Sequence, residues 1–443
     1  MNTVAQQEQK PARDFSHAWR ALQHRNFRLF FGGQSVSLIG TWMTRVATSW
    51  LVYRLTKSPL MLGTVGFAGQ IPTFLLAPFA GVIVDRIDRR SVLIWTQAIA
   101  MIQSLLLAVL TLTHHINIME VLALSILQGS VNAFDMPGRQ SFMIEMVEDR
   151  ADLSNAIAIN SSMVNLARLL GPALAGILIA ATNEGWCFAI DGISYIAVII
   201  SLLMMRVKPA AQAESSTSMM EQLREGWSYV ANFSPVRTIL LLFALISLMG
   251  WPFMVLMPVF AAQVLHGGPH TLGFLMGAVG VGSLTSALLL VARRSVRGLT
   301  RVIPVAAAIF GTGLILFGFS HSVWLSMLMM LFTGFGMMQG TTASNTIIQT
   351  LVDGKMRGRV MSFYTMAFVG MAPFGSLLAG ALAKAIGAQR TVIFSGVICV
   401  LGSLWFWSQL KTIGKEMRPI YERLGIVLQR SVAAAETVAP TAQ

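Results

Sequence analysis

The chain has 443 residues, of which 55% are hydrophobic and only 12% charged, and its formal net charge is +13. Soluble domains carry about 25% charged residues, so this composition excludes an ordinary soluble protein and predicts a membrane protein. The basic residues lie in short segments between apolar stretches and form no basic face interleaved with aromatics, so we do not expect nucleic-acid binding.

The apolar stretches are long enough to cross a bilayer, which takes about 20 helical residues. Backbone amides in lipid need internal partners, and runs this continuously apolar lack the alternation of barrel strands, so the predicted fold is all-α. We expect a polytopic protein with twelve transmembrane helices, at 27–53, 60–83, 92–112, 120–142, 156–181, 186–205, 236–264, 271–292, 302–320, 323–351, 360–383 and 391–410.

The expected helices fall into two sets of six with related sequences. The stretch GPALAGIL at 171–178 matches GSLLAGAL at 375–382, as in transporters built from duplicated halves. We therefore predict two pseudo-symmetric six-helix bundles. The predicted parts are a cytoplasmic N-terminal segment (1–26), the first bundle (27–205), a cytoplasmic linker (206–235), the second bundle (236–410) and a cytoplasmic tail (411–443) with a disordered end.

Orientation follows from the positions of Lys and Arg, which concentrate on the cytoplasmic side of membrane proteins. With the N-terminus inside, 26 of the 32 lie in inner segments, four in outer loops and two inside spans. Both termini are thus predicted to be cytoplasmic. The stretch 1–28 is polar and basic, which does not fit a cleavable signal peptide.

The segment 81–90 joins the second and third spans and concentrates charge in a short loop. Gly81 permits a close helix approach or a turn, and Asp85 can meet Arg139 or a neighbouring helix N-terminus. Three arginines, Arg86, Arg89 and Arg90, would hold the loop at an anionic inner leaflet. Two interpretations stay open: these residues only set the topology, or they form a gate contact that breaks and re-forms during transport.

This segment resembles the signature of the major facilitator superfamily between its second and third helices, with Asp88 where a glycine is usual. The stretches WLVYRLTKSP at 50–59 and PGRQS at 137–141 are similar to the branch that contains the enterobactin exporter and macrolide-efflux proteins. The resemblance covers about residues 20–410. It implies an exporter in a bacterial inner membrane that works by alternating access.

The fifth span carries Gly171, Pro172 and Gly176, which resemble a signature common among exporters of the superfamily. Small residues let helix backbones pack closely, and Pro172 removes a backbone donor and can kink the helix. Ordinary tight packing and a role in preventing leak are equally open interpretations.

Few charged residues lie in the interior of predicted spans, where charge is costly and usually functional; the candidates are Arg45, Asp135, Arg168 and Asp191. Asp135 and Arg168 lie about 20 Å from the outer ends of their adjacent spans, so we expect them to pair, with Arg45 and Asp191 as a second pair. Arg139 competes for Asp135 at the i+4 position. Static struts are the alternative for both pairs.

Proton coupling requires a carboxylate in the first half, because the only acid between Gly226 and Lys415 is Asp353, in a predicted loop. Asp135 is our first candidate and Asp191 our second. Two departures from the superfamily pattern weaken a simple transfer of its coupling mechanism. Arg45 stands where many drug exporters carry an acid. In the fourth span, the Arg-x-x-Gln-Gly pattern of the superfamily has Ser125 in place of its arginine, ahead of Gln128 and Gly129.

We expect a largely neutral cavity, lined by Gln128, Asn132, Trp251, Gln339 and Asn345.

These features favour export of drug-like or siderophore-like organic molecules by proton antiport. The two span arginines would suit an anionic or catecholate-bearing solute. An importer or facilitator, or a sensor or partner subunit without turnover, remains an alternative. No nucleotide loop, metal cluster or nucleophile–base arrangement predicts an enzyme, a cofactor or a metal. We expect Cys187 and Cys399 to be buried thiols, and the expected partners are a small organic substrate, protons and lipid; the sequence assigns no oligomeric state.

Overall fold

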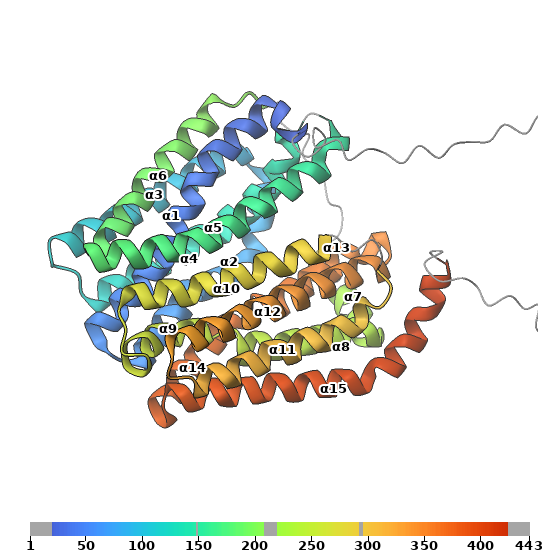
Figure 1. Ribbon diagram of the computed structural model, residues 1–443. Helices are drawn as coiled ribbons and strands as arrows, with labels where there is room; N and C mark the ends of the chain where they lie inside the picture. Colours follow the sequence, from blue (N-terminus) through green and yellow to red (C-terminus); the bar gives the residue numbers. More distant parts are fainter. Residues whose placement is uncertain (1–19, 148, 208–218, 292–295, 424–443) are drawn as a thin grey trace, which may run out of the picture. The chain divides into compact units, whose positions relative to one another are not determined.

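The computed structural model describes residues 20–147, 149–207, 219–291 and 296–423, which form two compact units. The described parts of 1–51 and 71–214 belong to unit 1, and those of 52–70 and 215–443 belong to unit 2. The predicted disordered end of the tail and part of the predicted linker lie outside the described residues. All regular structure in the described ranges is helical, as predicted (Figure 1).

The first half of the chain forms six long helices. They are α1 (Arg25–Thr56), α2 (Pro59–Arg86), α3 (Arg89–Leu112), α4 (Ile118–Met146), α5 (Leu153–Ala181) and α6 (Glu184–Met204). Each lies on one predicted span and extends it by at most a few residues at either end. In unit 1, α3 packs against both α4 and α6.

The second half begins with a short amphipathic helix and continues as a bundle. Its helices are α7 (Met219–Asn232), α8 (Ser234–Leu245), α9 (Phe253–Val259), α10 (Pro269–Val291), α11 (Leu299–Phe319), α12 (Val323–Leu351), α13 (Gly354–Phe368), α14 (Ala372–Ile386) and α15 (Ala388–Arg423). In unit 2, α12 packs against α10 and α11, and α11 packs against α15. Gly311 and Gly396 allow α11 and α15 to approach closely, because a Cβ on either would lie under 3.0 Å from the other's carbonyl oxygen.

Two predicted spans of the second half are irregular. The first contains two π-helical turns, at Ile246–Gly250 and Phe260–Val264, beside Pro252 and Pro258. Proline has no N–H to donate, so the helical hydrogen-bond pattern must change around it. The span predicted at 360–383 divides into α13 and α14 around the turn 369–371, just before Pro373.

The outer faces of the helices carry many large apolar side chains. Among the described residues, ten helical segments are long and apolar enough to cross a membrane. The other two predicted spans are α1 and α4, which have 32 and 29 residues but more polar sequences. Trp324 is 80% exposed and Trp95 69% exposed, which fits lipid contact and would be costly in water.

Candidate functional site

Asp191 on α6 is buried in unit 1 and surrounded by hydroxyl groups. Thr44 of α1 donates a hydrogen bond of 2.9 Å to its Oδ2, and the hydroxyls of Ser104 and Thr41 lie 3.1 and 3.4 Å from the carboxylate. Gly40 makes this approach of α1 possible, because a Cβ there would lie 2.9 Å from Asp191 Oδ1. Three helices, α1, α3 and α6, therefore build the environment of one carboxylate.

Two of these hydroxyls have a second acceptor within reach. Ser104 Oγ lies 3.0 Å from the carbonyl oxygen of Phe188, and Thr41 Oγ1 lies 3.0 Å from that of Ser37. A hydroxyl has one proton to donate and two lone pairs that accept. Each of these groups can therefore donate to the carboxylate, or donate to its carbonyl and accept a hydrogen bond from the protonated Asp191. The same side chains can satisfy both the ionised and the protonated acid.

Asp135 on α4 has a different environment, which includes a positive charge. Its carboxylate forms an ion pair with Arg139, one helical turn away, and accepts hydrogen bonds from Gln97 (2.7 Å) and Thr96 (3.1 Å) of α3. The predicted pair of Asp135 with Arg168 is therefore wrong. The i+4 neighbour is held close by the helix itself, and Pro137 between the two does not separate them.

Arg45 on α1 and Arg168 on α5 lie at the same aromatic ring. The guanidinium carbon of Arg45 is 4.6 Å from the centroid of Trp42, and that of Arg168 is 5.3 Å from it. The predicted pair of Arg45 with Asp191 is also wrong, because the carboxylate is bonded to hydroxyl groups instead. Trp42 was not among the residues expected from the sequence, although its i,i+3 spacing to Arg45 places both on one face of α1.

The fifth-span glycines belong to the contact between α5 and α1. A Cβ on Gly171 would lie 2.4 Å from the Cβ of Trp42 and 3.0 Å from the carbonyl oxygen of Ile39. Pro172 and Gly176 are buried in the same helix. The close approach at Gly171 thereby sets the position of the tryptophan that both arginines contact.

The charged loop is held mainly by contacts of α3 with other helices. Arg90 donates to the carbonyl oxygens of Leu202 and Leu203 at the end of α6, both at 2.7 Å, and Arg89 pairs with Glu145 of α4. Arg86 is exposed, and an added Cβ on Gly81 would meet open space, so no close approach requires that glycine. The side chain of Asp85 lies outside the described residues, and the cation it was expected to meet, Arg139, pairs with Asp135.

Asp88 has a local role that explains why an acid fits there. It is the N-cap of α3 and accepts hydrogen bonds from the backbone N–H (2.9 Å) and hydroxyl (2.6 Å) of Ser91. Partial burial acts to raise the pKa of Asp88, but the Ser91 hydrogen bonds together with the backbone N–H and charge of Arg90 hold the pKa below its ordinary value. The capping hydrogen bonds thus favour the ionised side chain.

The expected cavity-lining residues lie on helices that the structure describes, in separate local settings. Gln128 donates to Asn132 within α4 (3.2 Å), while Gln339 of α12 accepts from Ser286 of α10 (2.7 Å). Asn345 accepts from Gln349 (3.0 Å), and Trp251 packs edge-on against Phe368 at 5.0 Å. Whether they line one cavity stays a prediction.

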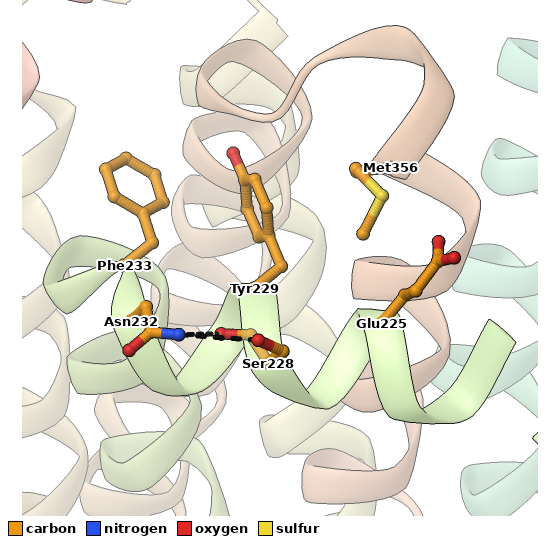
Figure 2. A pocket seen from close by; sticks show the side chains of 6 residues that line it. All are labelled: Glu225, Ser228, Tyr229, Asn232, Phe233 and Met356. Carbon is orange, nitrogen blue, oxygen red and sulfur yellow. Dashed lines mark hydrogen bonds between the residues drawn. The ribbon is translucent and has the colours of Figure 1, made fainter. Parts of the chain in front are cut away.

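An open hollow of about 480 Å³ lies between α7 and α13 in unit 2. Figure 2 shows its lining residues, which include Glu225, Tyr229 and Met356, and none is a predicted site residue. Trp227 packs against Phe363 (6.0 Å), and Glu225 pairs with Arg359, so these contacts hold α7 against α13. Within the described ranges, no cluster of three His, Cys, Asp or Glu side chains could hold a metal ion, and Cys187 and Cys399 are buried and unpaired.

Comparison with known proteins supplies the family. A family model described as transmembrane secretion effector, within the major facilitator superfamily, matches residues 16–420. The staphyloferrin A transporter of Staphylococcus aureus is 25% identical, with 86% of this chain and 95% of that protein covered. The multidrug efflux pump Tap of Mycolicibacterium fortuitum is 24% identical (80% and 88% covered), and macrolide efflux protein A of Streptococcus pyogenes is 21% identical (85% and 96% covered).

Solved structures agree on the fold. The nucleoside transporter NupG, in a mutant form, matches with a TM-score of 0.68 at 12% identity, covering 88% of this chain and 99% of that one. A bacterial homologue of the human lysosomal transporter Spinster matches with a TM-score of 0.66 at 14% identity, covering 92% and 99%. The helical architecture, the membrane-length segments and the match over almost the whole chain lead to one conclusion: this multi-pass membrane protein is a transporter of the transmembrane secretion effector family, within the major facilitator superfamily, and not an enzyme.

Proposed function

We propose that this chain exports drug-like or siderophore-like organic molecules across a bacterial inner membrane, with both termini in the cytoplasm, by proton antiport and alternating access. The relatives named for staphyloferrin A transport, multidrug efflux and macrolide efflux support export of organic molecules. The distribution of Lys and Arg supports the orientation.

The observation that carries proton coupling is the environment of Asp191. Asp191 is 2% exposed, and no ion pair of the described residues includes it. A buried carboxylate without a cation binds a proton more readily than one in an ion pair. Asp135 has Arg139 to stabilise its charge. We therefore place Asp191 ahead of Asp135, the reverse of the order expected from sequence.

Protonation of Asp191 would change the contact between α1 and α6. The ionised acid accepts from Thr44 and draws the hydroxyls of Thr41 and Ser104 toward it, whereas the neutral acid can donate to one of them. A proton can drive transport only if it binds one conformation more tightly than the other. In this proposal, the proton enters from outside, neutralises Asp191, and leaves to the cytoplasm in the conformation that favours the ionised acid.

The test is efflux of a panel of dyes, macrolides and catecholates from cells that express the chain, with and without a protonophore. We expect protonophore-sensitive efflux of at least one compound. Absence of efflux for every compound would overturn the exporter proposal, uptake instead of efflux would favour an importer, and efflux unaffected by the protonophore would overturn proton coupling.

Two matched variants separate the candidate carboxylates. Asp191→Asn should abolish protonophore-sensitive efflux while the protein still inserts into the membrane. Asp135→Asn tests the first expectation from sequence in the same assay. Loss of coupling only in Asp135→Asn, with Asp191→Asn unchanged, would show that we have chosen the wrong carboxylate.

A further inference from the structure

Trp42 brings together two positive charges from two different helices of unit 1. The guanidinium groups of Arg45 and Arg168 lie 4.6 and 5.3 Å from the centroid of this one ring, so they are separated by no more than the sum of those distances. Cations are attracted to an aromatic face, which explains how the two side chains are held. It does not offset their mutual repulsion in surroundings of low dielectric constant.

Neither arginine has an anionic partner in the part of unit 1 that the structure describes. The two span carboxylates of this unit are bonded elsewhere, Asp191 to hydroxyl groups and Asp135 to Arg139. The Nε of Arg168 is buried and has no hydrogen-bond partner. Guanidinium is a planar donor group with no acceptor of its own, so this cluster lacks the oxygen atoms that would satisfy it.

The depth of the cluster argues against lipid headgroups as the missing partner. Arg168 lies near the middle of α5, about 20 Å along the helix from either end. A headgroup phosphate stays near the bilayer surface, whereas a charged side chain this far into a span usually faces a water-filled path or a ligand. Arg45 is exposed although its neighbours Val46 and Ala47 are buried, so one of the two cations is open to an approaching molecule.

We propose that Trp42, Arg45 and Arg168 form a binding site for the carboxylate of an organic anion. This inference rests on the proposed export function and specifies its substrate class. Guanidinium groups bind carboxylates through paired charge-assisted hydrogen bonds, and two arginines fit a group of one or two negative charges. Trp42 keeps both guanidinium groups in place before the anion arrives, which reduces the entropy lost on binding.

A pair of dyes that differ in one carboxylate tests the site directly. Fluorescein carries a free carboxylate, and in fluorescein methyl ester this carboxylate is esterified. Binding to the purified full chain in nanodiscs of zwitterionic lipid is followed by fluorescence polarisation. We expect fluorescein to bind at least about tenfold more tightly than its ester, the size of effect expected for charge-assisted hydrogen bonds. Arg45→Gln and Arg168→Gln should each remove this preference.

The control variant is Arg237→Gln, on α8, where an exposed arginine donates to the carbonyl of Ala231. It should keep the preference for fluorescein. Equal affinity for the two dyes, absence of fluorescein binding, or an unchanged preference in both span variants would overturn the anion site. Loss of the preference on adding phosphatidylglycerol to the nanodiscs would mean that headgroups occupy the cluster, and would overturn it too.

Thermal unfolding gives a second readout that does not depend on transport. An anion that binds the folded protein raises its melting temperature. Fluorescein should therefore stabilise the wild-type chain and the Arg237→Gln variant. It should not stabilise the double variant that combines Arg45→Gln with Arg168→Gln. Without dye, the double variant should be at least as stable as wild type, because a like-charge repulsion has been removed. A double variant that fluorescein stabilises as it does wild type would overturn the site.

Vesicle transport of the same dyes separates this inference from the proposed function. If binding depends on the two arginines but vesicles move neither dye, nor any compound of the efflux panel, the export proposal fails and the anion site stands. If wild type and both arginine variants transport fluorescein and its ester equally well, the anion site fails and export stands.

Discussion

Gly171 of α5 lies directly against Trp42 of α1, with only 2.4 Å between the Trp42 Cβ and a Cβ built on the glycine. Real Cβ contacts essentially never reach this distance, so any larger residue at 171 must push the two helices apart or move the tryptophan. Because Arg45 and Arg168 both contact Trp42, this glycine controls the geometry of both cations.

The first prediction therefore concerns Gly171→Ala. Overpacking of a tight contact costs about 1–3 kcal/mol, so we expect a lower melting temperature in detergent and a weaker preference for fluorescein over its methyl ester. Gly32→Ala is the matched control, since a Cβ there meets nothing within 4 Å. Equal stability of the two variants would show that the contact between α1 and α5 relaxes freely.

The second prediction concerns the ion pair of Asp135 with Arg139. Asp135→Asn leaves the guanidinium without its carboxylate and should cost about 2 kcal/mol of unfolding free energy, as for a hydrogen bond between charged groups. The double variant with Arg139→Gln should recover part of this loss. The two single variants and the double variant form a cycle that measures the coupling, and additive effects would mean that the pair contributes nothing.

The third prediction concerns Arg90, which bonds to two carbonyl oxygens at the end of α6. Arg90→Lys keeps the positive charge that sets the topology but loses the planar fork that reaches both carbonyls. We expect normal membrane insertion, a loss of about 1–2 kcal/mol in stability and slower efflux. If Arg90→Lys behaves as wild type while Arg90→Ala inserts poorly, the loop arginines act only as topology signals.

The fourth prediction concerns the pH dependence of the α3 cap. Asp88→Ala, which removes the capping side chain, should cost about 1 kcal/mol at neutral pH. Because the folded state lowers the pKa of Asp88, the cap contributes fully above the unfolded-state pKa of about 3.9 and its contribution is lost as the pH falls through the lower folded value.

The measurement is the melting temperature of wild type and Asp88→Ala across the acid range. The difference between the two should shrink as the medium becomes more acidic. Asp88→Asn provides the control, because asparagine caps helices well and does not titrate. A difference that stays constant down to strongly acidic pH would contradict a role for the ionised cap.

Helix positions followed from the sequence because they depend on local composition. The third predicted span, 92–112, ends at the residue where α3 ends, and the split at 369–371 was missed because the apolar run continues through it. The pairs that we expected from matching depths in the membrane, Asp135 with Arg168 and Arg45 with Asp191, were wrong. Depth along a helix does not take into account that the helix itself holds Arg139 beside Asp135. It also does not show which hydroxyl groups of α1 and α3 contact Asp191.

Helix α2 is divided between the two units at residue 70, and this has a consequence for expressing the protein as two separate polypeptides. Residues 59–70 of this helix belong to unit 2, where a Cβ on Gly63 would lie 2.5 Å from the carbonyl oxygen of Ser376 on α14. If the gene is divided after residue 214, the first polypeptide carries residues 52–70, which belong to unit 2. The second polypeptide then lacks these residues of its own unit. In the first polypeptide the stretch 59–70 would have no α14 to pack against, and the second would lack that stretch, so each should be degraded when made alone and accumulate when the two are made together.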